Sequence, residues 1–218
     1  MAEATLLISS KNYSSWSLRG YLLACLSGID FVEERVSPDD PRAKEELLGR
    51  TSSILVPCLI HGDVSVWDTL AIAEYLNEVF PDAGMLPKDS HARARCRSIS
   101  GEMHSGFSAL RSSLPMNLRF RKPGFTVWSS AQADIDRITS IWRDCLTTWG
   151  GPFLFGRKPT IADAMYAPVV TRFISYDVSV DDQSHAYGET IMGWAPMKVW
   201  VADSHDEPQE IIELDLDF

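Results

Sequence analysis

The sequence predicts an N-terminal α/β domain with the element order βαβαββα, followed by an all-helical domain. Three observations support this fold class. Short apolar runs of strand length alternate with helix-like segments over residues 1–80. Two prolines and a glycine then interrupt both periodicities, so residues 81–88 are a predicted linker. From there the apolar residues recur at helical spacing, which predicts a helical domain over residues 89–202 and an acidic tail over 203–218.

The first half of the α/β domain reads as strand, helix, strand, helix. Thr5–Ser9 is a short apolar run typical of a strand, and Leu18–Leu26 is apolar on most faces, as a buried helix is. Gly28 ends that helix. A second strand is predicted over Phe31–Val36 and a second helix around Ala43–Leu48.

The second half of this domain reads as a hairpin followed by a helix. The strands Cys58–Ile60 and Val64–Trp67 flank His61-Gly62-Asp63, which has the composition of a tight turn. A helix is predicted over Thr69–Val79. This βαβ unit followed by ββα is the order of a thioredoxin-like domain, with one parallel crossover and one antiparallel hairpin.

The remainder of the chain is predicted to be helical. A long helix is expected from His91 to about Ser113. The apolar face of a second helix repeats at helical spacing through Ile135, Ile138, Ile141, Trp142, Cys145, Leu146 and Trp149. Thr160 and Asp163 form a capping-box pattern ahead of another apolar helix, so we expect them to act in folding rather than in chemistry.

The charge and the cysteines restrict the class of protein. There are 30 acidic and 20 basic side chains, a net charge of -10, so nucleic acid is not expected as a partner. The cysteines, at positions 25, 58, 96 and 145, have no CxxC or metal-site spacing, and we expect them to be reduced and mostly buried, with no bound metal. No apolar stretch is long enough to span a membrane, and the location expected is the cytoplasm. The acidic tail is expected to be solvated or loosely docked.

Two motifs point to one family. Val56-Pro57 precedes the hairpin, and Asp68-Thr69 opens the helix after it within the run Trp67–Leu76. Together with the domain order, they make the chain resemble the soluble glutathione transferases over nearly its whole length. The resemblance implies a cis peptide bond at Pro57, backbone pairing of Val56 with the glutathione cysteinyl group, and contacts from Asp68 and Thr69 to the γ-glutamyl end.

The chemistry of these residues fits the implied roles. A backbone turned outward before a cis-proline can pair with an extended peptide as an added strand does. A helix start at Thr69 offers unused N–H groups to a carboxylate, while Asp68 can hold an ammonium group. The alternative is that Asp68 or Thr69 only caps the helix.

The turn between the first strand and the first helix reads Asn12-Tyr13-Ser14-Ser15. It resembles the catalytic turn of serine-using bacterial and zeta-like members, so the glutathione sulfur is expected there. A hydroxyl donor at a helix N-terminus stabilises a thiolate. Ser14 is the first choice for this donor and Ser15 the second, with Asn12 or Tyr13 adding a hydrogen bond. The alternative is a helix-capping serine without chemistry.

Other candidate residues carry weaker signals. The apolar Leu55 stands where family members often have a lysine, so Arg50 is the candidate to reach the glycyl carboxylate. By the resemblance, His104, Met103 and Phe107 on the long helix would border the second-substrate pocket. A lone histidine is more often an ordinary packed or surface residue, and Met103 and Phe107 are also typical core residues.

Three functions are compatible with these residues. The first is an enzyme that activates the thiol of glutathione, its cosubstrate, for attack on a small electrophile. The second is a glutathione-dependent cis–trans isomerase, similar to maleylacetoacetate isomerase. The third is a glutathione transferase-like binding module without chemistry. The resemblance also implies a homodimer.

Overall fold

The computed structural model describes residues 2–36, 41–51 and 53–208 of the chain. The last part of the predicted acidic tail, residues 209–218, lies outside the described residues.

A four-stranded mixed sheet forms the centre of the first domain. Its strands are β1 (Ala4–Ile8), β2 (Phe31–Arg35), β3 (Cys58–His61) and β4 (Val64–Trp67), in the spatial order β2-β1-β3-β4. The β1–β2 pair is parallel, whereas β3 is antiparallel to both β1 and β4. The predicted crossover and hairpin are both confirmed.

The strand register determines which loops meet. Leu7 near the end of β1 lies opposite Cys58 at the start of β3, and Cys58 lies opposite Trp67 at the end of β4. The segments that follow β1, precede β3 and follow β4 therefore emerge at the same end of the sheet.

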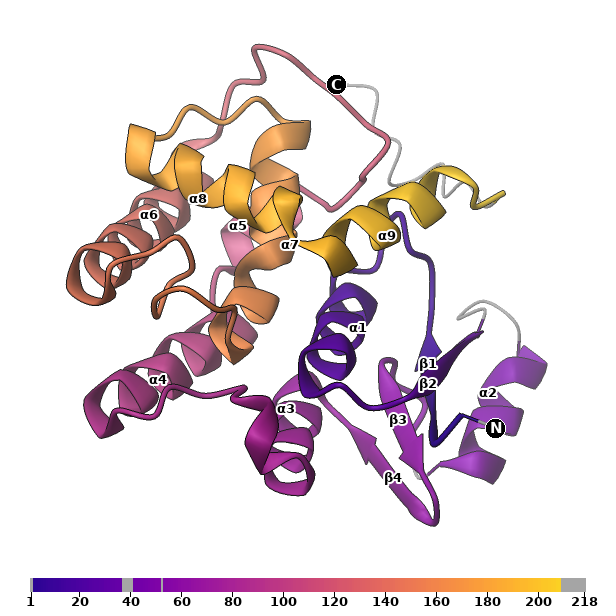
Figure 1. The fold of residues 1–218 in the computed structure, drawn as a ribbon. Coiled ribbons are helices and arrows are strands. Elements are labelled where there is room, and N and C mark those ends of the chain that lie inside the picture. Colours follow the sequence, from indigo (N-terminus) through magenta and orange to yellow (C-terminus); the bar gives the residue numbers. More distant parts are fainter. Residues whose placement is uncertain (1, 37–40, 52, 209–218) are drawn as a thin grey trace.

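Helices cover both faces of this sheet. Figure 1 shows α1 (Ser15–Ser27) and α3 (Thr69–Val79) on one face and α2 (Pro41–Arg50) on the other. The C-cap of α1 is Gly28 in the left-handed region, with φ 77°, where a side chain would be strained. Gly28 therefore ends α1, as the sequence predicts.

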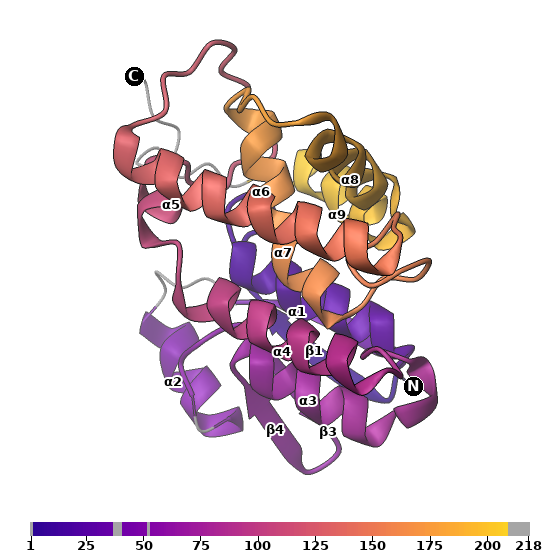
Figure 2. The ribbon, with the colours of Figure 1, turned by 90° about the vertical axis from the view of Figure 1, so that its left-hand side faces the viewer.

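The second domain is helical, and in Figure 2 its helices lie above the first domain. A short 3-10 helix, η1 (Pro81–Ala83), lies between α3 and the helices that follow. These are α4 (Ser90–Ser105), α5 (Ser108–Ser113), α6 (Ser129–Trp149), α7 (Ile161–Ser175), α8 (Asp182–Gly193) and α9 (Ala195–His205).

The single long helix predicted from His91 to Ser113 is two helices instead. Gly106 ends α4, and Phe107 adopts the left-handed conformation, with φ 60°, before α5 begins. A Cβ atom at Gly106 would lie 2.7 Å from the Glu102 carbonyl oxygen, so only glycine fits there. The break buries the Phe107 side chain in the core.

The predicted capping box at the start of α7 is confirmed. The Asp163 carboxylate accepts hydrogen bonds from the Thr160 backbone N–H (2.7 Å) and hydroxyl (2.9 Å). It also accepts from the Leu154 N–H at 3.0 Å and the Tyr187 hydroxyl at 3.2 Å. Because this carboxylate is fully buried, the four donors replace the water that it loses on folding.

The part of the predicted acidic tail that the structure describes is packed against the first domain. Asp203, within α9, lies 2.6 Å from the Lys11 ammonium, and Glu207 is buried. This segment is more firmly held than the solvated or loosely docked tail that its composition suggested.

Candidate active site

The register of the sheet brings the two predicted motifs and the predicted turn together. Ser14 follows β1, Val56 precedes β3 and Asp68 follows β4, all at one end of the sheet. The Val56–Pro57 bond is cis, as the family resemblance implies. Pro57 packs against α1 so closely that a Cβ atom at Gly20 would lie 2.6 Å from the Pro57 Cβ. This contact fixes Val56 beside α1.

Ser14 is the N-cap of α1. Its Oγ accepts a hydrogen bond from the Ser17 backbone N–H (3.2 Å) and donates to the Ser17 hydroxyl oxygen (2.9 Å). The side chain is half-buried. The Ser14 hydroxyl proton can rotate toward a ligand while its oxygen keeps the cap, so capping and thiol activation are compatible at this residue.

Ser15 occupies a more enclosed place than Ser14. Its side chain is buried, and its Oγ accepts a hydrogen bond from the Arg172 guanidinium at 3.2 Å. Ser14 is therefore the more accessible hydroxyl, and the choice between the two serines stays a prediction in Ser14's favour.

Asn12 and Tyr13 are the buried members of the turn. The Asn12 Oδ1 accepts from the Leu118 and Arg119 backbone N–H groups at 2.8 and 3.1 Å, while its Nδ2 is buried with no partner among the described residues. The Arg119 guanidinium lies over the Tyr13 ring, 6.0 Å from its centroid. Both side chains join the turn to the segment after α5, and their predicted hydrogen bond to the sulfur stays a prediction.

Glu207 holds the same turn from the C-terminal side. Its carboxylate accepts from the Ser10 hydroxyl at 2.7 Å and from the backbone N–H groups of Lys11 and Asn12 at 2.9 and 3.0 Å. The Arg35 guanidinium lies 2.8 Å from the same carboxylate. A buried carboxylate with four donors fixes the path of the chain just before Ser14.

Asp68 and His104 link the two domains beside the site. Asp68 caps α3 by accepting from the Leu70 N–H at 2.9 Å, so the capping role that the sequence allowed is present. Its other oxygen lies 3.0 Å from His104 Nε2, and His104 Nδ1 lies 3.4 Å from the Thr69 hydroxyl. Asp68 also has φ 75°, and a non-glycine residue held in this region is commonly found at a binding site.

Three arginines surround the predicted turn. The guanidinium groups of Arg19 and Arg111 both lie over the Trp16 ring, with their central carbons 4.9 and 4.8 Å from its centroid. Arg172 donates to Ser15 and to the Leu114 carbonyl. Trp16 is also in edge contact with the His104 ring, at 5.1 Å between centroids.

These arginines bear positive charge, and the Asp134 carboxylate acts electrostatically on one of them, Arg111. Arg19 donates to the carbonyls of Met165 and Ser15, and Arg111 to those of Gly106 and Met103. Within the described ranges, none of the three forms an ion pair. Burial, and then the neighbouring Arg111, lower the pKa of Arg172 to about 9, and burial followed by Arg111 and Arg172 lowers the pKa of Arg19 well below its usual value. A guanidinium nevertheless keeps its proton in proteins. The site is therefore locally positive in an acidic protein.

The sequence motifs pointed to none of these three arginines as site residues. No short motif could have identified them, because Arg172 reaches Ser15 across more than 150 residues of sequence. Glu207 was likewise read only as part of an acidic tail. A buried position for a tail glutamate is visible only in the folded chain.

In the structure, Arg50 forms an ion pair with Glu34. Its guanidinium forms two hydrogen bonds with the Glu34 carboxylate, one of them at 2.9 Å, on neighbouring surface segments. The hydrogen bond from Arg50 lowers the pKa of Glu34. Contact between Arg50 and the glycyl carboxylate of glutathione stays a prediction.

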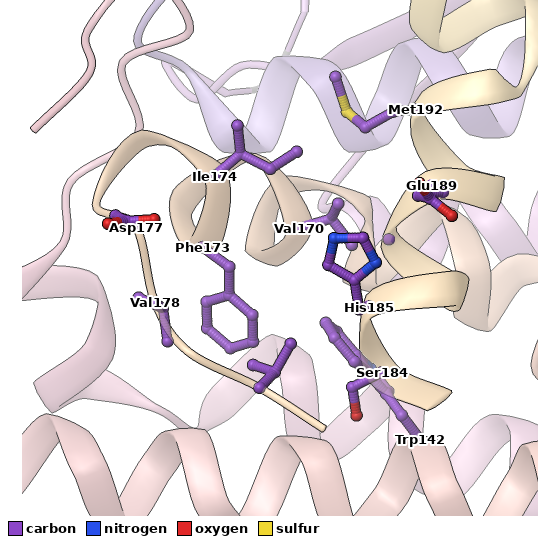
Figure 3. Close-up of a pocket in the computed structure, with 12 residues that line it drawn as sticks. Trp142, Val170, Phe173, Ile174, Asp177, Val178, Ser184, His185, Glu189 and Met192 are labelled. Carbon is purple, nitrogen blue, oxygen red and sulfur yellow. The ribbon is translucent and has the colours of Figure 1, made fainter. Parts of the chain in front are cut away.

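Met103 and Phe107 are part of the core, and their predicted contact with a second substrate is likewise untested. A cavity with a volume of about 360 Å³ lies elsewhere, among α6, α7 and α8 (Figure 3). No predicted site residue lines it.

All four cysteines are free, and three of them are buried. Burial raises the pKa of Cys96 to about 12 and those of Cys25 and Cys145 to about 11. In the part of the chain that the structure covers, no cluster of metal-binding side chains occurs, and none of the helices there is long and apolar enough to cross a membrane.

Comparisons with known families match both domains. The model described as "Glutathione S-transferase, N-terminal domain" matches residues 13–79, and the one described as "Glutathione S-transferase, C-terminal domain" matches residues 91–202. The N-terminal match includes Tyr13, Ser14 and Ser15 of the turn, the Val56-Pro57 motif and the Asp68-Thr69 motif.

Comparisons with individual proteins indicate the same family. The chain is 30% identical to a probable maleylacetoacetate isomerase of Caenorhabditis elegans over 72% of this chain and 73% of that protein. It is 29% identical to glutathione S-transferase 1 of Dianthus caryophyllus over 76% of each chain. Its fold resembles a glutathione transferase homolog from Burkholderia gl BGR1, solved with bound glutathione, with a TM-score of 0.70, 23% identity, and coverage of 95% of this chain and 100% of that one. The resemblance predicted from the sequence is confirmed: the chain belongs to the glutathione S-transferase family.

Proposed function

We propose that this protein activates the thiol of glutathione for attack on a small electrophile. The observation that carries the proposal is the strand register, Leu7 opposite Cys58 and Cys58 opposite Trp67, because it gathers Ser14, Val56 and Asp68 at one end of the sheet. A tripeptide can reach all three only if the loops emerge together.

Each part of glutathione has a complementary group at this end of the sheet. The γ-glutamyl carboxylate would bind the free N–H groups at the start of α3, by Thr69, and its ammonium would bind the Asp68 carboxylate. The cysteinyl backbone would pair with the Val56 N–H and C=O as an added strand does. This placement directs the sulfur toward the N-terminus of α1.

Ser14 would stabilise the thiolate there. A free thiol has a pKa near 8.5, so little thiolate exists at neutral pH. A hydrogen bond from the Ser14 hydroxyl, the positive end of α1 and the nearby guanidinium groups all favour the anion. Each unit by which they lower the thiol pKa corresponds to about 1.4 kcal/mol.

The arginine cluster favours a second candidate function, cis–trans isomerisation of an unsaturated carboxylate. Arg19, Arg111 and Arg172 donate hydrogen bonds to carbonyl and hydroxyl oxygens; Arg19 and Arg172 are buried, whereas Arg111 is half-buried, so a substrate carboxylate would bind at Arg111. The Caenorhabditis elegans relative is named a probable isomerase of this kind.

The isomerisation would need no other reactant. The thiolate adds to the conjugated C=C bond, forming a C–S bond and moving the electron pair onto the adjacent carbonyl oxygen. Rotation about the resulting single bond follows. Return of the electron pair expels the thiolate and leaves the trans double bond, so glutathione is regenerated.

We further propose that the protein is a homodimer located in the cytoplasm. Val64, Trp67 and Val79 are exposed apolar side chains on β4 and α3, and a partner subunit would cover such residues. The four free cysteines fit a reducing compartment. Light scattering after size-exclusion chromatography tests the dimer, and a monomer at micromolar concentration would contradict it.

Calorimetric titration with glutathione, followed by two activity assays, tests the proposed function. We expect saturable binding with a dissociation constant in the millimolar range or below. Conjugation of 1-chloro-2,4-dinitrobenzene would support the transferase, and turnover of a cis-unsaturated diacid would support the isomerase. Binding without either activity would identify a binding module, and absence of binding would contradict both enzymatic functions.

A further inference from the structure

The cavity among α6, α7 and α8 has the character of a small-molecule site. Its volume of about 360 Å³ lies in the range of ligand pockets, which bury an apolar body and present a few polar groups. Trp142 and Phe173 form aromatic walls, with ring centroids 5.5 Å apart, and Val170 and Met192 add aliphatic surface. The interior therefore suits a flat aromatic group.

The pocket is separate from the candidate active site. Val170, Phe173, Ile174 and Asp177 recur at the spacing of one helical face along α7 and the turn that follows it, and all four line the pocket. Arg172 lies between them in sequence but extends to Ser15 and Leu114 on the other side of α7. A ligand in this pocket would be divided from glutathione by the width of that helix.

The polar groups at the edge of the pocket are mainly acidic. Figure 3 shows Asp177 on one side and His185 and Glu189 on the other, with Phe173 between them. The Asp177 carboxylate accepts one hydrogen bond, from the Gly124 N–H at 3.1 Å. Among the described residues, the Glu189 carboxylate has no hydrogen-bond or ion-pair partner, and it is exposed. This edge therefore attracts a cation, as does the net charge of -10.

The Trp142 side chain is deeply buried beside the pocket. The Trp142 indole is 1% exposed, and its Nε1 has no hydrogen-bond partner in the described part of the chain. A buried N–H without an acceptor is costly, by about 1–3 kcal/mol, and such groups normally have a partner. Because this atom is closed to solvent, a ligand in the open part of the pocket would touch the indole ring and not Nε1.

We propose that this pocket binds a small arylalkylamine, an aromatic ring bearing an ammonium group on a short alkyl chain, with the ring at the Trp142 and Phe173 side of the pocket and the ammonium group at Glu189. The proposal does not depend on glutathione chemistry. It predicts that binding requires both the apolar volume and the carboxylate, and that glutathione does not compete.

Tyramine is a suitable probe, because it combines a phenol ring with an ammonium group. Calorimetric titration of the full chain should give saturable binding that persists in the presence of saturating glutathione. The matched anion 4-hydroxyphenylpropanoate should bind at least about fivefold more weakly, since it would place a carboxylate near Glu189 and Asp177. Equal binding of the two, or no binding of tyramine at several millimolar, would overturn the proposal.

A substitution at Gly188, which lines the pocket, tests whether tyramine needs the pocket volume without disturbing the fold. A Cβ atom there would meet only the Val170 Cγ1, at an ordinary contact distance of 3.5 Å, so Gly188→Leu extends into the pocket. Gly193→Leu, on the same helix but with no atom within 4 Å of its Cβ, is the matched control. Tyramine binding should be lost in the first variant and kept in the second, with glutathione affinity unchanged in both.

Glu189→Gln tests the charge, and we expect about fivefold weaker tyramine binding with unchanged thermal stability. Unchanged tyramine affinity in this variant would refute the placement of the ammonium group. Size-exclusion chromatography of Gly188→Leu tests whether a second subunit, rather than a small molecule, covers this surface. If that substitution changes the oligomeric state while tyramine fails to bind the original protein, this surface is a subunit interface and the proposal is wrong.

Discussion

His104 on α4 lies 3.0 Å from the Asp68 carboxylate at the start of α3, which joins the helical domain directly to the proposed γ-glutamyl site. The same imidazole lies 3.4 Å from the Thr69 hydroxyl and contacts the Trp16 ring. One side chain of the second domain therefore touches two proposed glutathione-binding residues and the first turn of α1. Although His104 is a candidate for the second-substrate pocket, its contacts suggest a role in glutathione binding.

The substitution His104→Ala is expected to weaken glutathione binding by about two- to fivefold, because a partly exposed pair of this kind contributes up to about 1 kcal/mol. Calorimetry measures the change. His91→Ala, at an exposed position on the same helix, is the control and should bind as the original protein does. Equal affinity in both variants would exclude the positioning role of His104.

Ser14 can be tested by separating its capping role from its chemical one. Ser14→Ala removes both the hydroxyl and the cap, whereas Ser14→Gly removes the hydroxyl but retains most of the capping stability. Both should lower turnover near neutral pH by about 100-fold, as loss of one donor to a developing anion does. At high pH, where the thiol ionises unaided, the difference from the original protein should narrow.

The pH profile also identifies the serine involved. If Ser15→Ala shows this pH-dependent loss and Ser14→Gly does not, the sulfur lies at Ser15 instead. A flat pH profile in every variant would mean that neither hydroxyl stabilises the thiolate.

Glu207→Ala is expected to lower the free energy of unfolding by about 2–4 kcal/mol, because it leaves Ser10, Lys11 and Asn12 with buried donors that lack an acceptor. Glu207→Gln should cost less, since the amide oxygen can keep part of the network. Urea denaturation measures both. Asp206→Asn, at the exposed neighbouring position, should leave stability nearly unchanged, and a similar loss there would point to a general effect of charge.

Arg111 distinguishes the two enzymatic candidates. Arg111→Gln should lower kcat/KM for an unsaturated diacid by about tenfold, since it removes one cation from the proposed carboxylate site. The same variant should change conjugation of the uncharged 1-chloro-2,4-dinitrobenzene much less. An equal loss with both substrates would indicate a packing defect, because Arg111 also holds two carbonyls of the α4–α5 connection.

The protein's own thiols should not compete with glutathione. With pKa values raised to about 11, Cys25 and Cys145 would be thiolates in only about one molecule in a thousand at pH 8, and Cys96 in fewer. We therefore expect slow reaction with a chromogenic disulfide in the native state and rapid reaction of all four cysteines after denaturation. Rapid native labelling of any buried cysteine would contradict these pKa shifts.

The sequence predicted the parts of the fold that local patterns determine. The strand Val64–Trp67 and the helix Thr69–Val79 match β4 and α3 in both bounds, because alternation ends where Asp68 caps the helix. The sequence did not predict the break at Gly106–Phe107, because the apolar residues keep helical spacing through it. The turn there buries the Phe107 side chain, which only the folded chain shows.

The sequence likewise predicted only the parts of the site that lie in contiguous motifs. Val56, Asp68 and the serine turn belong to contiguous motifs, so their positions could be read in order along the chain. Arg172 and Glu207 reach this turn from distant segments, and a charged residue carries no sequence signal for burial next to a backbone turn. Which charges enter the interior depends on tertiary packing.

The attachment of Glu207 to residues 10–12 has a consequence for protein synthesis. The strands and helices of the first domain are translated early, yet the acceptor for the Ser10, Lys11 and Asn12 donors is made nearly 200 residues later. On the ribosome, the turn before Ser14 cannot adopt its final hydrogen bonding until the chain has emerged past Glu207. A nascent chain that has not reached residue 207 would therefore lack the carboxylate that accepts these three donors.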